Sequence, residues 1–198
     1  MGLNLEYIDG QTPLDEEEKE GLKIPTISTR EELDEFEQHN IEESLQWLLT
    51  RKFKPEQILS EKFIRDLHKR MFGEVWKWAG QFRSTQKNIG VDYWQIPTQL
   101  KMLLDDAMLW YRDSVFEPDE LAIRFKHRIV SIHCFPNGNG RHSRLMADVI
   151  IEKIYGQEVF SWGAGDLSSN SQARTNYLKA VKAADHNDFN LLFQFSRT

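Results

Sequence analysis

Apolar residues recur at the spacing of α-helices along most of this chain of 198 residues. One stripe runs through Ile41, Leu45, Leu48 and Leu49, which occupy the i, i+4, i+7 and i+8 positions of one helix face. Similar stripes predict further helices over about 55–73, 100–111, 118–133, 141–155, 170–184 and 191–195. Because such stripes usually form a protein core, we interpret them as packing positions rather than cofactor contacts.

Start signals support several of these helices. Thr29 and Glu32 have the spacing of a capping box, in which each side chain binds the backbone N–H of the other residue. Pro55 and Pro118 stand where proline favours the first turn of a helix. The predicted fold class is therefore all-α, a helical bundle.

The stretch 82–96 departs from the helical period. It contains Thr85, Asn88 and Gly90, and Pro97 follows directly after it. These residues favour turns, so the pattern fits a short β-hairpin or an irregular flap. A plain loop that covers the core is the simpler alternative when the stretch is considered alone.

The segment before about Pro25 is polar and includes the acidic run 15–18. Such a composition favours an extended arm that lies on the domain or is partly disordered. We therefore divide the chain into an N-terminal arm, residues 1–27, and a helical domain, residues 28–198.

Net charge and cysteine content restrict the functional classes. The formal net charge is -6 and the isoelectric point is about 5.6, which argues against nucleic-acid binding as the main task. Cys134 is the single cysteine, so no internal disulfide can form and a cytoplasmic location is expected. No apolar run has transmembrane length, so no membrane partner is expected.

Tryptophans could suggest a platform for nucleic-acid bases. Trp76 and Trp78 flank Lys77, which is the combination that such platforms use. Core packing is the more frequent role of such residues, and we expect it here. The same expectation holds for Trp94, Trp110 and Trp162.

Residues 133–144 concentrate polar chemistry in one short segment. His133 follows an apolar run, and a free imidazole with a pKa near ~6.5 is suited to accept a proton. Gly138 and Gly140 flank Asn139 and can form a turn whose backbone N–H groups bind an anion at the start of the next helix.

Two arginines follow the glycine-rich turn. Arg141 and Arg144 are three residues apart and project from one face of the predicted helix. Two guanidinium groups beside such a turn can bind phosphate oxygens in pairs. A glycine turn, a core histidine or a solvated arginine pair would each be ordinary alone, but their combination indicates a polyphosphate site.

The whole segment resembles the signature of the Fic (filamentation induced by cAMP) family, His-x-Phe-x-(Asp/Glu)-Gly-Asn-Gly-Arg-x-x-Arg. The resemblance implies a Fic-type helical bundle with a short β-hairpin flap and transfer of AMP from ATP to a hydroxyl group of a target protein. It implies that His133 is the base and that Arg144 lies near the γ-phosphate. The α- and β-phosphates would contact Gly138, Asn139, Gly140 and Arg141.

Asn137 departs from this signature, because the family usually has an acid at this position that ligates Mg²⁺. A carboxamide oxygen can still ligate a hard cation but brings no charge. Activity that is weaker or directed to another nucleotide, and a metal held mainly by phosphates and water, are both compatible with this change.

The resemblance extends to the flap. Gly80 to Arg83 match a family signature that precedes a flap on which the target chain docks by strand addition. At this place the sequence has Ile89, Gly90 and Val91. Edge pairing contacts the backbone of a target, so these residues would not define its identity.

Two further residues fall where family members bind adenine, between the flap and the last helices. Tyr177 could stack on the base or bind near it, and Asp185 could contact it. Each has a structural alternative, since Tyr177 lies on an apolar stripe and Asp185 can cap the last helix.

Many Fic proteins carry an inhibitory helix, (Ser/Thr)-x-x-x-Glu-(Gly/Asn), whose glutamate pairs with the second arginine. By this resemblance Glu37 would pair with Arg144. The match is incomplete, because Leu33 and Gln38 occupy the flanking positions. A solvated helix face is the alternative interpretation of this segment.

The arm, residues 35–38 and Asn137 together resemble the subgroup called mobile mystery protein B, which implies a DNA-binding companion protein. A catalytically silent module that binds a nucleotide or a protein, and a hydrolase that removes AMP, are the alternatives to an AMP transferase. A thiol enzyme based on Cys134 is disfavoured, because adjacent residues rarely form a dyad with the right geometry.

Overall fold

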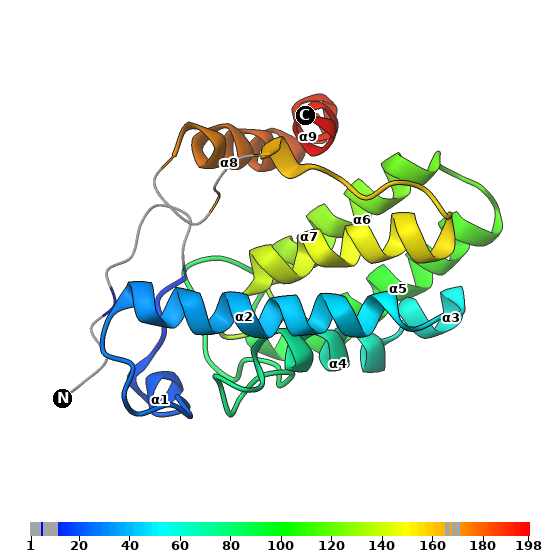
Figure 1. Cartoon of the computed structure of the whole chain (residues 1–198). Coiled ribbons are helices and arrows are strands. Elements are labelled where there is room, and N and C mark those ends of the chain that lie inside the picture. The colour runs from blue at the N-terminus through cyan, green and yellow to red at the C-terminus, as the bar shows by residue number, and fades with distance from the viewer. Residues whose placement is uncertain (1–4, 6–11, 165–166, 168–170) are drawn as a thin grey trace.

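The computed structural model describes residues 5, 12–164, 167 and 171–198, and it confirms the all-α class (Figure 1). Within these residues, the one strand-like pairing is an isolated bridge between Leu22 and Trp76. The helical elements are α1 (Glu16–Lys19), α2 (Arg30–Leu49), α3 (Pro55–Ile58), α4 (Glu61–Phe72), η1 (Tyr93–Gln95), α5 (Ile96–Arg112), α6 (Pro118–Ile132), α7 (Asn139–Val149), η2 (Ile150–Ile154), η3 (Trp162–Ala164), α8 (Gln172–Ala184) and α9 (Asn190–Arg197).

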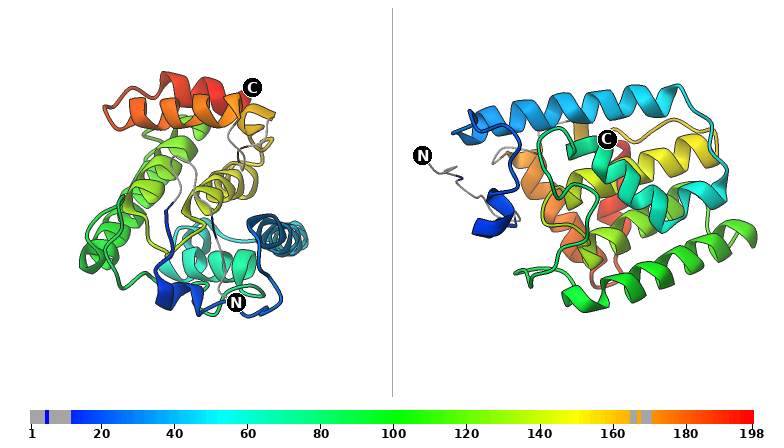
Figure 2. Two further views of the ribbon diagram at one scale, coloured as in Figure 1. Left: turned by 90° about the vertical axis from the view of Figure 1, so that its left-hand side faces the viewer. Right: turned by 90° about the horizontal axis from the view of Figure 1, so that it is seen from below.

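The helices form a layered bundle with α6 and α7 in its middle. Figure 2 shows α8 and α9 beyond this pair on one side, with α2 and α4 on the other. The core between the layers includes Leu67, Phe125, Phe135 and Met146, each with no exposed surface. Full burial of such a side chain contributes about 1.5–3 kcal/mol. The packing of α6 against α7 positions the turn that joins them.

The predicted capping box is confirmed at the start of α2. The Thr29 hydroxyl accepts a hydrogen bond from the Glu32 N–H, and the Glu32 carboxylate accepts one from the Thr29 N–H. The helix predicted over 55–73 is instead broken into α3 and α4. Ser60 lies between them, and its hydroxyl caps α4 by accepting from the Phe63 N–H.

The apolar stripe assigned to α2 is only partly buried, which corrects our interpretation. Leu45 and Leu49 are 40% and 70% exposed, whereas Leu48 is buried. The buried face instead carries the polar residues Glu37 and Asn40. A polar face can be buried when its groups are hydrogen-bonded. The Asn40 side chain meets this condition, because it donates to the Arg70 carbonyl and accepts from the Glu74 N–H.

The flap contains no strand, so the expected β-hairpin is wrong and the irregular alternative holds. Residues 82–92 have no regular structure, and η1 follows them. The Arg83 guanidinium replaces a strand ladder by donating to the carbonyls of Thr85 and Val91 within the flap. Trp94 is 63% exposed, so the expectation of core packing is wrong for this residue.

The other tryptophans pack as expected. Trp76 is 1% exposed and stacks on Trp78, with ring centroids 4.9 Å apart. Trp162 is buried, and Trp110 packs at the edge of the core against Phe116. Core packing therefore accounts for Trp76 and Trp78 in place of a nucleic-acid platform.

The described part of the arm lies on the helical domain. Its acidic run forms α1, and main-chain hydrogen bonds join Lys23 to Val75 and Lys77 to Gly21. Residues 1–4 and 6–11 of the arm lie outside the described residues. No helix in the described part of the chain is long and apolar enough to cross a membrane.

Candidate functional site

The turn between α6 and α7 has the backbone that the glycine-rich motif predicts. His133 ends α6 with a φ of 58°, and Gly138 precedes α7 with a φ of 77°. The Asn139 side chain braces the turn by accepting from the Phe135 N–H and donating to the Phe135 carbonyl, at 2.9 and 2.7 Å. The Asn139 side chain therefore stabilises the turn, and its backbone N–H is one of the first amide groups of α7.

Gly138 is required here by space as well as by φ. A Cβ atom at this position would lie 2.6 Å from the Phe72 ring. The first amide groups of α7 have no carbonyl partner within the helix, as in every helix N-terminus. The turn thus presents N–H groups in a place where larger side chains are excluded.

These residues border a cavity of about 750 Å³. It is lined by Thr12, Arg30, Glu31, Asp34, Glu35, Gln38, His39, Glu42, His133, Asn137, Gly138, Asn139, Gly140, Arg141, Arg144, Leu167, Arg174, Tyr177 and Leu178. The structure therefore brings the candidate base, the turn, both arginines and Tyr177 into one cavity. A volume of this size is in the range of small-molecule sites.

His133 is buried, with its ring and its backbone both engaged. The Nε2 atom lies 2.9 Å from the Thr12 hydroxyl oxygen, and its carbonyl accepts a hydrogen bond from Arg83 Nε at 2.7 Å. Burial, together with the cations of Arg83 and Lys87, lowers the pKa of His133 to about 4. The imidazole is therefore neutral at pH ~7 and can accept a proton.

This shift predicts the titration of His133. A free histidine takes up its proton near pH ~6.5, whereas His133 should stay neutral from pH ~8 down to ~5.5. We expect an unchanged Hε1 chemical shift across this range by NMR, with His133→Asn identifying the resonance. A half-change near pH ~6.5 would contradict the shift.

Glu37 forms an ion pair with Arg141, the first arginine of the motif. Its carboxylate lies 2.7 Å from Arg141 Nη2 and also accepts from Trp76 Nε1 at 2.5 Å. The Arg141 guanidinium lies over the Phe72 ring, 4.8 Å from its centroid. The sequence prediction is corrected here, because the ion-pair partner of Glu37 is Arg141 and not Arg144.

Arg144 and Tyr177 also line the cavity and contact each other. The Arg144 guanidinium lies 5.3 Å from the centre of the Tyr177 ring, and the ammonium group of the buried Lys126 lies 4.5 Å from it. Burial raises the pKa of Tyr177, but the cations of Lys126 and Arg144 outweigh this effect and bring it to about 8. Positive charge therefore accumulates where an anion could bind.

Asp185 does not line the cavity. Its carboxylate instead pairs with His127 Nε2 at 2.7 Å, and its backbone ends α8. The structure does not bring Asp185 together with the motif, and Asp185 does not cap the last helix either, because α9 begins after Phe189.

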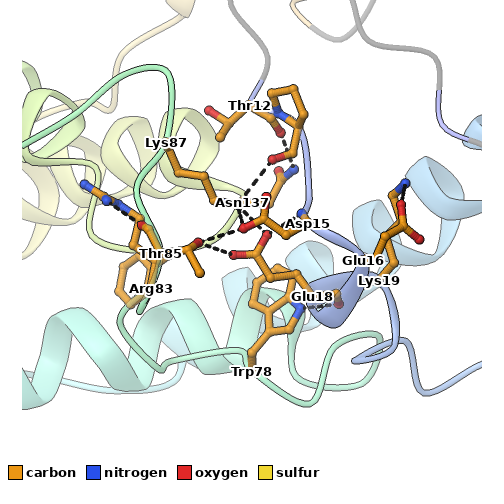
Figure 3. Close-up of polar contacts among 12 residues, drawn as sticks. Thr12, Asp15, Glu16, Glu18, Lys19, Trp78, Arg83, Thr85, Lys87 and Asn137 are labelled. Atoms are coloured by element: carbon orange, nitrogen blue, oxygen red, sulfur yellow. Dashed lines mark hydrogen bonds and ion pairs between the residues drawn. The ribbon is translucent and has the colours of Figure 1, made fainter. Parts of the chain in front are cut away.

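Asn137 lines the cavity, but its side chain is engaged. The Oδ1 atom accepts from the Gly138 N–H at 2.6 Å. The amide group donates to the Thr12 carbonyl at 3.4 Å (Figure 3). No cluster of three histidine, cysteine or acidic side chains suited to a metal occurs among the described residues. At position 137 the motif therefore offers Mg²⁺ a neutral side-chain oxygen, and this oxygen already has a partner.

The flap contacts the base directly. Gly90 has a φ of 97°, and a Cβ atom there would lie 2.5 Å from the His133 Cβ. The Val91 N–H donates to the Ile132 carbonyl at 3.3 Å, and Ile89 is 43% exposed. Gly90 and Val91 thus border the end of α6 at His133, although they form no strand.

Cys134 is excluded as a nucleophile by its surroundings. The thiol is buried, and burial raises its pKa to about 12. The thiolate that such chemistry needs is therefore not populated at pH ~7.

Known proteins resemble this chain in sequence and in structure. The model of the Fic/DOC family matches residues 58–151, which include α4 to α7 and the whole motif. This part of the chain therefore resembles a Fic/DOC family domain.

Relatives of the Fic/DOC domain share both sequence and fold. "Protein adenylyltransferase Fic" of Nematostella vectensis is 24% identical over 78% of this chain and 35% of its own length. The protein of the same name in Drosophila melanogaster is 28% identical over 68% of this chain and 26% of its own length. The chain thus spans about a third or less of the curated relatives that it matches.

Solved structures agree in fold. Fic-1 (residues 134–508) of C. elegans has a TM-score of 0.67 at 24% identity, covering 89% of this chain and 51% of that one. BepC of Bartonella tribocorum, solved with bound AMPPNP, has a TM-score of 0.64 at 18% identity, covering 95% and 92%. Both confirm the Fic-type helical fold.

Several site residues escaped the sequence analysis. Thr12 reaches His133 from 121 positions away, and no local pattern announces such a contact. Lys126 and Lys87 lie in ordinary polar surroundings of the sequence, yet both are buried. Arg83 was visible only as a position of the flap signature, and its contact with the His133 carbonyl was not.

Proposed function

We propose that this protein transfers AMP from ATP to a hydroxyl side chain of a target protein. The observation that carries the proposal is the contact of a hydroxyl oxygen with His133 Nε2, inside a cavity that Arg141 and Arg144 also line. A hydroxyl, a neutral base and cationic groups for phosphates are the parts that such a reaction needs.

Each group of residues would have its own role in the transfer of AMP. His133 Nε2 takes the proton of the attacking hydroxyl, whose oxygen then bonds to the α-phosphorus as pyrophosphate leaves. The first amides of α7, from Asn139 to Arg141, hold phosphate oxygens, and Gly138 and Gly140 keep this turn open. Arg144 stabilises the charge that develops on the departing pyrophosphate, near the γ-phosphate. Tyr177 borders the base or sugar of the nucleotide.

Mg²⁺ would neutralise phosphate charge. Asn137 Oδ1 is the protein oxygen that we assign to it, with phosphates and water supplying the other ligands. A DNA-binding companion, a cytoplasmic location and the division of the chain at residue 27 also belong to this proposal and rest on the sequence alone.

The direct test is incubation of the protein with Mg²⁺, a cell lysate and ATP labelled on the α-phosphate. We expect labelled protein bands that the same lysate without this protein lacks. The absence of α-label in every protein, with ATP binding intact by calorimetry, would favour a silent binding module. Release of AMP from previously modified protein would favour a hydrolase.

The ion pair of Glu37 predicts restrained ATP binding. Glu37→Gln keeps an oxygen that can accept from Trp76 but removes the charge that holds Arg141. We expect ATP to bind roughly 5- to 30-fold more tightly, which corresponds to about 1–2 kcal/mol, and labelling to rise with it. Calorimetry measures the first effect.

Glu43→Gln is the matched control, since Glu43 is exposed on the same helix and lines no part of this cavity. Equal ATP affinities of the two variants, with normal thermal melting, would assign Glu37 a purely structural role.

The neutral side chain of Asn137 predicts weak use of Mg²⁺. Asn137→Asp supplies a carboxylate, so we expect half-maximal labelling at a several-fold lower Mg²⁺ concentration and a higher rate. A Mg²⁺ titration of the labelling rate measures both effects, with Asn190→Asp at the start of α9 as the control. An unchanged titration would remove Asn137 from the metal site.

A further inference from the structure

The arm places a hydroxyl of this chain against its own candidate base. Thr12 is 6% exposed, and its Oγ1 atom lies 2.9 Å from His133 Nε2. Its carbonyl accepts a second contact from the Asn137 amide at 3.4 Å. Thr12 is therefore held from two sides, both of which belong to the motif.

The flap fixes the part of the arm that follows Thr12. The Lys87 ammonium group lies 2.8 Å from Asp15 Oδ2 and 2.6 Å from Glu18 Oε2, and the Thr85 hydroxyl donates to Asp15 Oδ2 at 2.7 Å (Figure 3). The side chains of Lys87 and Glu18 are only 3% and 12% exposed, so solvent screens this ion pair little, whereas Asp15 is 47% exposed. The arm thus lies along the flap, where a target chain would be expected to dock.

The Thr12 side chain also lies in the cavity that we assign to the nucleotide. Thr12 and His133 line the same cavity as Arg141 and Arg144. A threonine with a purely structural role would satisfy its hydroxyl equally well on a backbone carbonyl, outside such a cavity. This hydroxyl instead contacts a neutral imidazole beside the cationic groups.

We infer that Thr12 is an acceptor site for AMP, modified by the same chain that carries it. This inference rests on the proposed function and names a substrate for it, a threonine hydroxyl held in cis. The Oγ1–H proton passes to His133 Nε2, and a bond forms between Oγ1 and the α-phosphorus of a nucleoside triphosphate. The bond from the α-phosphorus to the bridging oxygen breaks, and pyrophosphate leaves with the electron pair.

The test is peptide mass spectrometry of the full chain after incubation with ATP and Mg²⁺. We expect one adenylyl group on the peptide that contains Thr12, in the wild type and in Thr12→Ser. Thr12→Val, which keeps the shape but removes the hydroxyl, should lose this modification completely. Thr98→Ala, at an exposed threonine of α5, is the matched control and should keep it. All four are also measured with Glu37→Gln added, so that the ion pair of Arg141 does not hide the reaction.

Kinetics separate transfer within one chain from transfer between chains. We expect the initial rate constant at Thr12 to stay unchanged over a tenfold range of protein concentration. A His133→Ala chain mixed with active enzyme should stay unmodified at Thr12. Modification of that chain would overturn the assignment of Thr12 as an acceptor in cis.

Other outcomes distinguish this inference from the proposed function. The protein could label other proteins, or other residues of its own, while Thr12 stays unmodified. In that case Thr12 only occupies the position beside His133, so the inference fails and the proposed function stands. If no protein receives AMP under any of these conditions, both fail.

Discussion

Replacing His133 with alanine should lower AMP transfer by about 10²- to 10⁴-fold, the usual contribution of a general base. The side chain holds a hydroxyl at Nε2 and is neutral, because burial lowers its pKa to about 4. Since a base acts in the transition state, the affinity for ATP should stay nearly the same. Single-turnover labelling and calorimetry measure the two quantities.

His186→Ala is a suitable control for this variant, because His186 is exposed at the end of α8 and lies outside the cavity. Equal labelling by His133→Ala and wild type would remove His133 from the reaction. A parallel loss of ATP affinity would instead assign it to nucleotide binding.

Replacing Arg83 with lysine should produce the largest loss of stability. The guanidinium donates to the carbonyls of His133, Thr85 and Val91, and the residue is 3% exposed. A lysine ammonium cannot match this planar fork, so buried carbonyls lose their donors. We expect unfolding to become easier by about 3 kcal/mol, with the melting temperature lower by roughly 6–12 °C.

Thermal and denaturant unfolding measure this effect against Arg112→Lys, an exposed arginine at the end of α5. Because Arg83 joins the flap to the His133 carbonyl, labelling should also fall in the fraction that remains folded. Equal unfolding free energies for the two variants would show that the flap is held by other contacts.

Helix positions could be predicted from sequence where burial follows hydrophobicity. The start of α2 at Thr29 and the starts of α3 and α6 at Pro55 and Pro118 were read from local signals, and they are confirmed. The glycines of the motif likewise predicted a turn before α7. The structure has Gly138 at a positive φ beside the Phe72 ring, where only glycine fits.

The sequence did not predict the structure where polar side chains are buried, or where contacts join segments that are far apart in the chain. The inner face of α2 carries Glu37, whose carboxylate is satisfied by Trp76 and Arg141, so a hydrophobic pattern could not identify it. The hairpin was wrong: Arg83 donates to the Thr85 and Val91 carbonyls of the flap, which pair with no strand. The contact between Thr12 and His133 depends on tertiary packing alone.

The buried ammonium group of Lys87 sets an energetic threshold for opening the site. Both of its carboxylate partners, Asp15 and Glu18, come from the arm. Lifting the arm would separate Lys87 from both carboxylates and from the Pro13 carbonyl, and breaking such a buried pair costs about 3–5 kcal/mol. At this cost the open form would be roughly 0.02–0.6% of the molecules. A competing chain gains access most readily if it brings its own carboxylate to Lys87, so acidic partners have a built-in advantage over basic ones.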